Sequence, residues 1–458
     1  MAIDYNILKG KKHIHFIGIG GSGMYPLAQI LFAQGYYLTG SDNNPGDTLT
    51  AVKNMGIPVY MGHAAENIDG ADLVVYSAAI MKDNPELCAA RERKIPSIER
   101  SVLLGIVTSW YQNAVCVCGT HGKTTTSSMI TQVFMQAGLD PTTVIGGKLS
   151  LIGGSGRVGH SQNMVCEACE YVDTFLKLSP DVAVILNIDR DHMEYFKTLD
   201  NLKASFRKFA QMTTRLLIVN GDDQNTLDAV ENLPQKTVTF GLAAQNDYYA
   251  QDIRSSVCTE THSLITSFDL YHHAQSLGRI SIRIPGRHNV YNALAACAAS
   301  LECGVSFEKT AEALAQFKSA ARRFDVLGIQ NGVTIADDYA HHPAELEATL
   351  KAALSLGFHH VWAVFQPFTF SRTAMLLDDF ARVLSLADRV ILTPIMGSRE
   401  INTYGIDSAD LQKKIDGCVL LPTFEAVADY IQKNAEPDDL VITLGCGDIY
   451  KAAKLMLQ

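Results

Sequence analysis

The sequence has 458 residues, of which 47% are hydrophobic and 19% are charged. A chain of this length exceeds one ordinary core, and this composition excludes an intrinsically disordered protein, so we expect several globular domains. The formal net charge of −10 and the lack of a Lys/Arg run argue against a protein that wraps nucleic acid.

Residues 1–12 are polar and show no signal-peptide pattern, and no apolar stretch approaches the roughly 20 residues of a membrane-spanning helix. We therefore expect a cytoplasmic protein. The cysteines are scattered through apolar runs, which favours buried, reduced thiols. Cys166 and Cys169 form a C-x-x-C pair, but no second pair with zinc-like spacing accompanies it.

Strand-like and helix-like segments alternate along the whole chain, which predicts an α/β fold with parallel sheets. We divide the chain into three blocks, residues 1–108, 109–317 and 318–458. The first is predicted to be a Rossmann-like domain with strands at His13–Ile17, Tyr37–Gly40 and Leu73–Tyr76. The second is predicted to have strands at Ala114–Cys118, Val182–Ile188 and Leu216–Asn220, a small antiparallel sheet within 236–285 and a helix at Val290–Cys303. The third is predicted to be a small α/β domain with strands at Val333–Asp338, Val361–Phe365, Val390–Leu392 and Leu440–Leu444.

A glycine-rich turn with the spacing G-x-G-G-x-G follows the first predicted strand. Gly18, Gly20, Gly21 and Ser22 would bring backbone amides close to a diphosphate at a helix N-terminus. Asp42 ends the next strand about 20 residues later, where an acid can bind a ribose. Considered alone, the turn is typical of NAD binding, so a nicotinamide-dependent oxidoreductase is one hypothesis.

A second loop, G-T-H-G-K-T-T-T at residues 119–126, lies between an apolar strand and a helix-like run. This is the arrangement of a phosphate-binding loop, here two residues shorter than the usual spacing. Lys123 would reach the outer phosphates, and the Thr124 hydroxyl would bind Mg²⁺. The predicted nucleotide-binding residues of the loop are Gly119, Thr120, His121, Gly122, Lys123, Thr124 and Thr125. Two phosphate loops suggest two ligands, a nucleotide diphosphate conjugate and ATP.

Acidic and histidine side chains follow two apolar strands of the central block. Glu167 and Glu170 come after M-V-C, and such carboxylates can bind Mg²⁺. The segment N-I-D-R-D-H, which ends at His192, follows the predicted strand Val182–Ile188, and ligands of α/β folds bind at such strand ends. His192 could bind a second metal ion or orient a phosphate. A solvated acid pair and a structural histidine are the simpler alternatives.

Further polar clusters lie at the starts of helices and the ends of strands. His288, Asn289 and Asn292 open a predicted helix and could contact an adenine edge, although Asn289 could also simply cap that helix. Arg323 belongs to an Arg-Arg pair near the start of the third block, and its planar guanidinium is suited to a phosphate. The segment D-D-Y-A-H-H-P at 337–343 follows a strand and precedes a helix. An acid–histidine cluster in that position favours a functional site.

Taken together and in order, these motifs resemble those of the Mur ligases, ATP-dependent enzymes that extend the peptide of the peptidoglycan precursor. The matching motifs are G-I-G-G-S-G-M, G-T-H-G-K-T-T-T, E-A-C-E-Y, N-I-D-R-D-H, G-R-H-N-V-Y-N-A, R-R-F, D-D-Y-A-H-H-P and F-Q-P-F-T-F-S-R-T. They cover nearly the whole chain. The resemblance implies three domains, of which the first binds a UDP-sugar, the second binds ATP and the third closes over both.

The resemblance also implies an activity. ATP would phosphorylate the lactyl carboxylate of UDP-N-acetylmuramate, and the amine of L-alanine would attack the acyl phosphate. The implied partners are these two substrates, with ATP and Mg²⁺ as cofactors, no nucleic acid and no membrane insertion, in a monomer or weak homodimer. Such chemistry needs charge neutralisation and alignment more than a protein nucleophile.

The motifs carry implied roles for individual residues. The implied catalytic residues are Lys123, Glu167, His192, Arg323, His341 and Arg372. The implied ATP-binding residues outside the phosphate loop are His288, Asn289, Asn292, Arg323 and Asp338. The implied substrate-binding residues are Gly18, Gly20, Gly21, Ser22, Asp42, Tyr339, His341 and Arg372. The implied metal ligands are Thr124, Glu167 and His192.

The chain departs from the family pattern at two positions. Cys169 stands where the family commonly has aspartate, and Phe368 stands where it commonly has histidine near the amino-acid site. Phe368 leaves open a ligase for another amino acid. A ligase that adds a recycled tripeptide to the same sugar nucleotide is a further alternative, although the resemblance implies a first glycine loop for it that differs from G-I-G-G-S-G-M. A nicotinamide-dependent oxidoreductase would leave Lys123, Glu167 and His192 without a role, and a non-catalytic relative would be expected to lose them.

Overall fold

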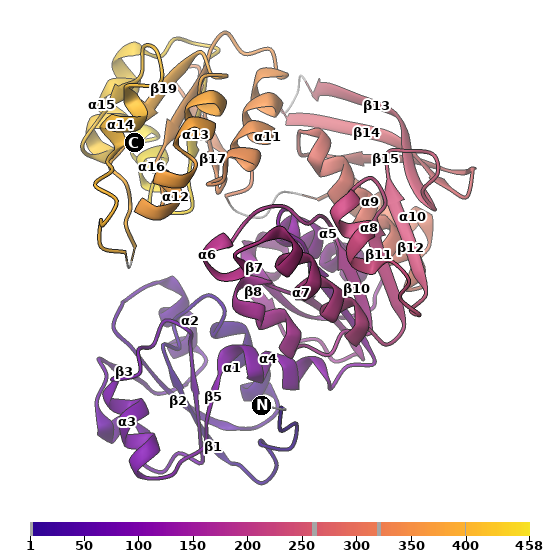
Figure 1. Cartoon of the computed structure of the whole chain (residues 1–458), viewed down its shortest axis with the longest axis vertical. Helices are drawn as coiled ribbons and strands as arrows, with labels where there is room; N and C mark the ends of the chain where they lie inside the picture. The colour runs from indigo at the N-terminus through magenta and orange to yellow at the C-terminus, as the bar shows by residue number, and fades with distance from the viewer. Residues whose placement is uncertain (1–2, 259–262, 318–321, 399) are drawn as a thin grey trace. The chain divides into compact units, whose positions relative to one another are not determined.

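The computed structural model describes residues 3–258, 263–317, 322–398 and 400–458 (Figure 1). The chain forms two compact units. The first consists of Met1–Gln251, Asp269–Ile280 and Tyr291–Ala315, and the second consists of Asp252–Phe268, Ser281–Val290 and Gln316–Gln458. The strands assemble into three sheets, and helices alternate with the strands along the chain.

The N-terminal sheet has five parallel strands in the order β3-β2-β1-β4-β5. Its strands are β1 (His13–Ile17), β2 (Tyr37–Asp42), β3 (Val59–Met61), β4 (Leu73–Tyr76) and β5 (Ser97–Glu99). Its helices are α1 (Tyr25–Ala33), α2 (Asp47–Asn54), the short η1 (Ala65–Ile68), α3 (Pro85–Glu92) and α4 (Arg100–Thr108). This order puts β1 in the centre, so the glycine turn after β1 lies at the carboxyl edge where ligands bind in Rossmann-like folds.

Both faces of this sheet are covered because successive side chains of a strand point to opposite faces. Phe16 of β1 is buried in one cluster with Leu27 and Leu31 of α1. The next residue, Ile17, is buried in a different cluster with Leu87 of α3. Burial of one such side chain contributes about 1.5–3 kcal/mol. A strand in which successive side chains are apolar, as Phe16 and Ile17 are, is stable only where both faces of the sheet are covered, which agrees with the central position of β1.

The central sheet has ten strands in the order β15-β14-β13-β12-β11-β10-β6-β9-β7-β8. Its strands are β6 (Asn113–Cys118), β7 (Thr142–Leu149), β8 (Gly154–Arg157), β9 (Asn163–Glu167), β10 (Val182–Ile185), β11 (Leu216–Asn220), β12 (Thr237–Gly241), β13 (Tyr248–Cys258), β14 (Ser263–His272) and β15 (Gln275–Ile282). Its helices are α5 (Lys123–Gln136), η2 (Ser150–Ile152), η3 (Tyr171–Lys177), α6 (Met193–Phe196), α7 (Leu199–Met212), α8 (Gln224–Val230), α9 (Arg287–Glu302) and α10 (Phe307–Ala315). Strands β6, β9, β10 and β11 pair in parallel. Their carboxyl ends therefore lie along one edge of the sheet.

The C-terminal sheet has six strands in the order β16-β17-β21-β18-β19-β20. Its strands are β16 (Asp325–Gln330), β17 (Val333–Asp338), β18 (Val361–Phe365), β19 (Arg389–Leu392), β20 (Val419–Leu420) and β21 (Leu440–Leu444). Its helices are α11 (Pro343–Leu354), α12 (Phe370–Met375), α13 (Leu377–Leu384), α14 (Ser408–Gln412), α15 (Phe424–Asn434) and α16 (Tyr450–Met456). Ala363 of β18 is buried with Leu350 of α11, and the next residue, Val364, is buried with Ile431 of α15. Helices therefore cover both faces of this sheet as well.

The predicted α/β fold is confirmed, with two differences in detail. The strands within 236–285 extend the central parallel sheet into one mixed sheet, because β12 pairs in parallel with β13. Only His273 and Ala274, both at positive φ (46° and 65°), connect β14 to β15, which is the geometry of a tight hairpin. The predicted helix Val290–Cys303 begins three residues earlier, at Arg287.

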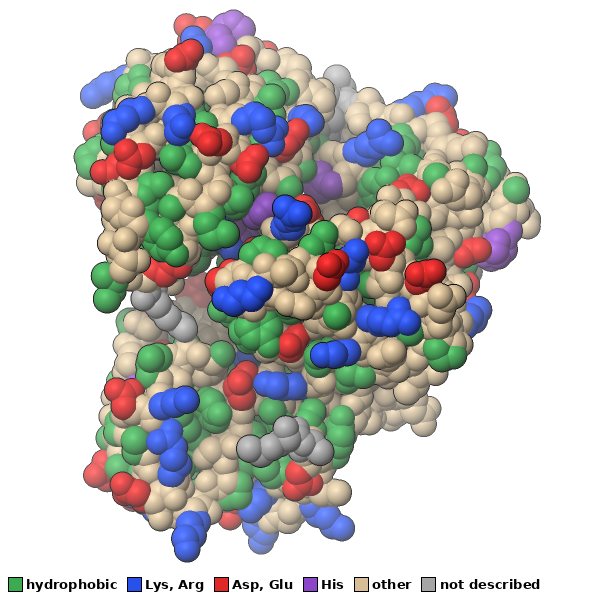
Figure 2. Space-filling view, in the orientation of Figure 1, with side chains coloured by type: hydrophobic (Ala, Val, Ile, Leu, Met, Phe, Trp, Pro, Cys, Tyr) green, Lys and Arg blue, Asp and Glu red, His purple; other side chains and the backbone are tan. Residues whose placement is uncertain are grey.

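The surface shown in Figure 2 carries basic and acidic side chains interspersed, without a continuous basic patch on that face. This agrees with the acidic overall charge of the chain. Among the described residues, no helix combines the length and the apolarity needed to cross a membrane.

Candidate active site

The phosphate-binding loop between β6 and α5 has a backbone that requires glycine at two positions. Gly119 has φ of 140° and Gly122 has φ of 86°, both in the region that favours glycine. A Cβ atom on Gly119 would lie 2.9 Å from Cβ of Leu186, and one on Gly122 would collide with Oδ1 of Asn292. The loop therefore packs too closely against its neighbours to accept side chains here.

Asn187, which follows β10, fixes the loop from the neighbouring strand. The amide of His121 donates to Oδ1 of Asn187 at 2.8 Å, and the amide of Thr120 donates to its backbone oxygen at 3.0 Å. Nδ2 of Asn187 donates in return to the His121 carbonyl at 3.1 Å. Asn187 is the first residue of the motif N-I-D-R-D-H, but no role was predicted for it. One sequence signal could have indicated that Asn187 supports the loop: an amide side chain comes soon after the strand that neighbours the phosphate loop.

Lys123 is the first residue of α5, and its side chain folds back over the loop. Nζ of Lys123 donates to the Gly119 carbonyl at 2.5 Å and lies 2.9 Å from Oε2 of Glu170. The side chain of Glu170 is 2% exposed. Burial lowers the pKa of Lys123, but the buried carboxylate of Glu170 outweighs it, so the net shift of the pKa is upward. Lys123 is thus a permanent cation at the N-terminus of α5, where α-helices attract anions.

Glu167, the last residue of β9, lies against the first turn of α5. The Thr124 hydroxyl donates to Oε2 of Glu167 at 2.8 Å, and the Gly146 amide donates to the same oxygen at 2.7 Å. The two acids of the E-A-C-E motif therefore differ: Glu170 pairs with the lysine, and Glu167 pairs with the threonine hydroxyl. A carboxylate beside a threonine hydroxyl is an all-oxygen donor set, which suits Mg²⁺.

His192 lies before α6 in a left-handed backbone conformation, with φ of 56°. The centre of its ring lies 4.7 Å from that of Tyr171, with the two rings tilted at 48°, and its Nε2 lies 3.6 Å from Oδ2 of Asp191. Within the described ranges, the one group of three His, Cys, Asp or Glu side chains close enough to share a metal ion lies elsewhere, in the C-terminal sheet. The structure therefore does not place His192 in a compact metal cluster with Glu167.

The first glycine turn has the backbone expected of a diphosphate loop. Gly18 has φ of 80°, and its amide donates to the Ser41 carbonyl at 2.8 Å. The amide of Gly20 donates to Oδ2 of Asp42 at 2.9 Å, so Asp42 holds the turn. Gly21 closes it, because its amide donates to the Gly18 carbonyl at 3.1 Å.

A small cavity of about 150 Å³ joins this turn to the central sheet. Ser22 and Tyr25 line it on one side, and Gly146, Lys148 and Ser155 line it on the other. The Ser155 hydroxyl donates to the Ser22 carbonyl at 3.1 Å. Gly146, which lines this cavity, also donates its amide to Glu167, so the cavity is one residue removed from the threonine–glutamate pair.

The three predicted adenine contacts at the start of α9 have different surroundings. Asn292 accepts a hydrogen bond from the Thr126 hydroxyl at 3.3 Å, next to the phosphate loop. His288 lines a cavity of about 520 Å³, together with Thr266 and Lys351. Asn289 is buried and donates to the Pro285 carbonyl at 2.6 Å. Its alternative assignment as a helix cap is wrong, because α9 already begins at Arg287 and Asn289 lies inside the first turn.

In the C-terminal unit, Asp338 ends β17 and is buried. It accepts hydrogen bonds from the amides of Phe324 at 2.6 Å and Ala340 at 2.7 Å. Burial raises the pKa of Asp338 to about 6, although Arg323 and the two amides act in the opposite direction. The guanidinium of Arg323 lies 5.1 Å from the centre of the Tyr339 ring.

Arg322 has a structural role that was not predicted from the sequence. It donates to Oδ2 of Asp337 at 2.9 Å and to the Gly445 carbonyl at 2.6 Å, while its guanidinium covers the rings of Tyr339 and Tyr450. Of the two adjacent arginines, Arg322 therefore joins the strand ends. The sequence alone does not distinguish the two arginines. Arg322 has φ of 64°, so the backbone turns there, and this turn is part of the folded structure that places its side chain at the strand ends.

The remaining predicted residues lie at the same edge of the C-terminal sheet. Nδ1 of His341 lies 3.0 Å from the Tyr339 carbonyl and 3.2 Å from Oε2 of Glu345. Arg372 lies in the first turn of α12, where its amide donates to the Thr369 hydroxyl at 3.4 Å. Phe368 follows β18 and pairs with Met396. All follow the carboxyl ends of strands, where ligands of α/β folds bind.

Comparison with known proteins identifies this set of motifs. Family models match three consecutive segments: "Mur ligase family, catalytic domain" matches residues 13–111, "Mur ligase middle domain" matches 117–300, and "Mur ligase, glutamate ligase domain" matches 322–447. A curated UDP-N-acetylmuramate–L-alanine ligase of Caldanaerobacter subterraneus subsp. tengcongensis is 43% identical and covers 100% of this chain and 99% of that protein.

Solved structures show the same likeness. The UDP-N-acetylmuramate-alanine ligase MurC from Thermotoga maritima has a TM-score of 0.82 at 26% identity, over 98% of both chains. A murein peptide ligase from Psychrobacter arcticus has a TM-score of 0.74 at 23% identity, over 97% of this chain and 98% of that one. At 23% identity, the likeness to the murein peptide ligase shows a shared fold.

Proposed function

The chain belongs to the Mur ligase family, and we propose that it uses ATP to join L-alanine to the lactyl carboxylate of UDP-N-acetylmuramate in peptidoglycan precursor synthesis. The observation that carries the proposal is full-length similarity at 43% identity to a ligase named for this reaction. The chain also keeps a phosphate loop in which Lys123 and Thr124 each have an acidic partner. A relative without activity would have no need to retain both pairs.

The domain roles follow from the two glycine loops. Residues 1–108 would bind the UDP-sugar, 109–317 would bind ATP, and 318–458 would complete the site. The amides of Gly18–Ser22 can face a diphosphate at the start of α1, and those of the second loop can face the phosphates of ATP at the start of α5. ATP and a nucleotide sugar are cytoplasmic metabolites, so the cytoplasm is the proposed place of action, with a monomer or weak homodimer as the active form.

Lys123 is the proposed contact for the transferred phosphate. Its ammonium group already lies among loop carbonyls and the Glu170 carboxylate, so it is oriented before any nucleotide arrives. Negative charge that spreads over the γ-phosphate during transfer would be neutralised by this cation and by the N-terminal amides of α5. A prepositioned cation needs no reorganisation during the reaction.

The donor set of Thr124 and Glu167 fits Mg²⁺, since it presents a hydroxyl and a carboxylate oxygen 2.8 Å apart at the start of α5. Bound there, Mg²⁺ would neutralise phosphate charge. His192 remains a proposed further ligand or phosphate contact. Glu167 would also keep the Gly146 turn in place through the amide of that residue.

The sugar nucleotide is proposed to enter the small cavity between Ser22 and Gly146. A diphosphate on the Gly18–Ser22 turn would let the lactyl end of the sugar extend toward Glu167 and Lys123. Its carboxylate oxygen would attack the γ-phosphorus of ATP and ADP would leave. The amine of L-alanine would then attack the acyl carbon, lose a proton and expel phosphate. Tyr339, His341 and Arg372 are the proposed contacts for the amino acid and the acyl phosphate.

Two alternatives make different predictions. A ligase for a recycled tripeptide would resemble the murein peptide ligases; those from Psychrobacter arcticus and Neisseria meningitides are 23% and 30% identical, the latter over 68% of this chain, whereas the curated alanine ligase is 43% identical over the whole chain. An oxidoreductase would leave the Lys123–Glu170 and Thr124–Glu167 pairs without a role. Because Phe368 stands near the proposed amino-acid site, the identity of the amino acid is the property to test first.

The test is phosphate release from ATP and Mg²⁺ in the presence of UDP-N-acetylmuramate. L-Alanine, L-serine, glycine and the tripeptide are compared as acceptors. We expect the highest kcat/KM with L-alanine. A preference for another acceptor would keep the ligase family and assign the specificity to the region of Phe368. No release with any acceptor, despite nucleotide binding, would contradict the proposed activity.

A further inference from the structure

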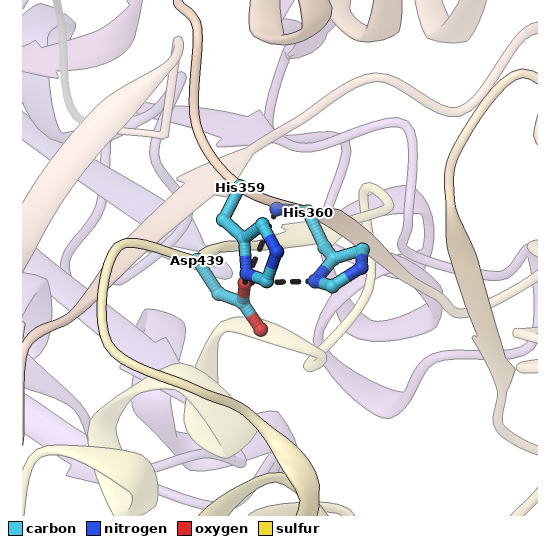
Figure 3. A group of neighbouring side chains, drawn as sticks. All are labelled: His359, His360 and Asp439. Atoms are coloured by element: carbon cyan, nitrogen blue, oxygen red, sulfur yellow. Dashed lines mark hydrogen bonds and ion pairs between the residues drawn. The ribbon is translucent and has the colours of Figure 1, made fainter.

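Three side chains that the proposed reaction does not use form a compact group at the far end of the C-terminal sheet (Figure 3). His359 and His360 immediately precede β18, and Asp439 immediately precedes β21. These strands pair in parallel with Val361 opposite Leu440, so residues 79 positions apart become neighbours. Asp338 ends β17 and Phe368 follows β18, both at the carboxyl ends of strands in the same sheet, whereas this group lies at the amino ends. It is therefore separate from the candidate active site.

The distances within the group are those of donors that share one ion. Nδ1 of His360 lies 3.1 Å and Nδ1 of His359 lies 3.6 Å from the same oxygen of Asp439, Oδ1. The ligand atoms of all three lie within 4.8 Å of one another. A tetrahedral zinc ion with ligands at about 2.0–2.1 Å separates its ligand atoms by roughly 3.3 Å. Glu436 is a further carboxylate nearby, since its Oε2 lies 3.6 Å from Nδ1 of His359. It lies outside the three-donor group and, being exposed, would have to turn toward the ion to act as a fourth donor.

The carboxylate of Asp439 is oriented before any ion binds. Its side chain is 1% exposed, and its other oxygen, Oδ2, accepts hydrogen bonds from Nε1 of Trp362 at 2.8 Å and from the Glu436 amide at 3.0 Å. Such outer contacts fix the orientation of a metal-binding carboxylate. Figure 3 shows both imidazole rings turned toward this carboxylate, and the ring centres lie 4.0 Å apart. The other ligands are reachable from solvent, because the side chain of His359 is 54% exposed.

The donor chemistry selects the class of ion. Two imidazole nitrogens with one or two carboxylates suit Zn²⁺ and its transition-metal neighbours, whereas Mg²⁺ prefers oxygen donors throughout. We propose that His359, His360 and Asp439, with Glu436, bind one Zn²⁺-class ion that joins the starts of β18 and β21. The site is a structural clip, and it is independent of the Mg²⁺ proposed at Thr124 and Glu167.

The test titrates the full-length, chelator-treated and dialysed chain with Zn²⁺ in a calorimeter, without nucleotides or substrates. We expect one saturable site per chain. The double variant His359→Ala/His360→Ala should bind Zn²⁺ at least about tenfold more weakly. Glu436→Gln is the milder variant and should weaken binding while leaving the buried carboxylate in place. Co²⁺ should give the visible spectrum of a tetrahedral nitrogen and oxygen site, without the near-ultraviolet band of thiolate ligation.

The chain provides its own matched control. His272 and His273 are also adjacent, with ring centres 4.2 Å apart, and Nδ1 of His273 lies 3.3 Å from Oδ1 of Asp247. Among the residues that the structure describes, that pair belongs to no three-donor group. His272→Ala/His273→Ala should therefore leave the titration unchanged. Equal Zn²⁺ affinity of the wild type and His359→Ala/His360→Ala, or loss of binding in the control, would overturn the proposal and leave the group as a hydrogen-bonded connection of two strand starts.

Discussion

Nζ of Lys123 and Oε2 of Glu170 lie 2.9 Å apart in the candidate active site, and both side chains are largely removed from solvent. A buried charge that loses its partner costs about 3 kcal/mol, whereas removal of both charges costs far less. Glu170→Gln should therefore lower the free energy of unfolding by about 3 kcal/mol and lower turnover. Lys123→Met/Glu170→Gln should recover most of the stability and none of the turnover. Thermal unfolding and phosphate release measure the two effects.

Lys123→Ala should remove phosphate release while leaving binding of the UDP-sugar largely intact, because the two glycine loops are separate. Lys433→Ala, at an exposed position of α15, provides the control and should change neither quantity. Retained turnover in Lys123→Ala would reject the assignment of the phosphate loop.

The Thr124 hydroxyl and the Glu167 carboxylate make a different prediction. Glu167→Gln removes the negative charge of the proposed magnesium site, so half-maximal turnover should require at least about tenfold more Mg²⁺. Glu170→Gln is the matched comparison, because it neutralises the neighbouring acid and should leave the Mg²⁺ requirement nearly unchanged. If both variants required the same higher Mg²⁺ concentration, the two carboxylates would contribute equally to Mg²⁺ binding, which would contradict the assignment of Glu167 alone. Turnover measured across Mg²⁺ concentrations gives the answer.

Gly122 and Gly35 allow backbone strain to be separated from close packing. Both have φ of 86°, but a Cβ atom on Gly35 would meet nothing within 4 Å, whereas one on Gly122 would collide with Asn292. Gly35→Ala should cost about 1–2 kcal/mol of stability from backbone strain alone. Gly122→Ala should cost more and should also weaken ATP binding. Equal costs with intact ATP binding would show that the contact to Asn292 does not shape the loop.

Apolar runs predicted many strands closely, because burial decides where these strands lie. Leu216–Asn220, Val333–Asp338 and Leu440–Leu444 are strands with the predicted bounds. The predicted strand Val182–Ile188 instead ends at Ile185, since the chain must turn there for Asn187 to reach the phosphate loop. The local sequence pattern cannot show where this strand ends, because the end depends on the hydrogen bond between Asn187 and His121, which lie 66 positions apart.

The roles of neighbouring residues were harder to predict than their presence. The motif indicated both Glu167 and Glu170, but only the folded backbone separates them, because Glu167 ends β9 whereas Glu170 lies beyond the strand, directly before η3. The His359–Asp439 group was not predicted at all. Its members meet only through the pairing of β18 with β21, and no short-range spacing records that pairing.

Asp338 gives a prediction about pH. Its pKa is about 6 in the folded chain, raised by burial, and about 3.9 in an unfolded chain. Between these values the folded chain binds more protons, so the contribution of Asp338 to stability falls as the pH rises through this window. The unfolding free energy of the wild type relative to Asp338→Asn should therefore drop by about 1.4 kcal/mol per pH unit between about pH 4 and pH 6, and then level off.

Trp362 provides the signal for this measurement, because it lies in the same sheet as Asp338 and the sequence has only one other tryptophan, Trp110. Urea unfolding followed by Trp362 fluorescence in a Trp110→Phe background reports on the C-terminal unit. The same substitution at exposed Asp429 is the control and should leave the pH dependence unchanged. A flat difference between the wild type and Asp338→Asn from pH 4 to pH 6 would mean that Asp338 stays ionised despite its burial, stabilised by Arg323 and the two amides that it accepts.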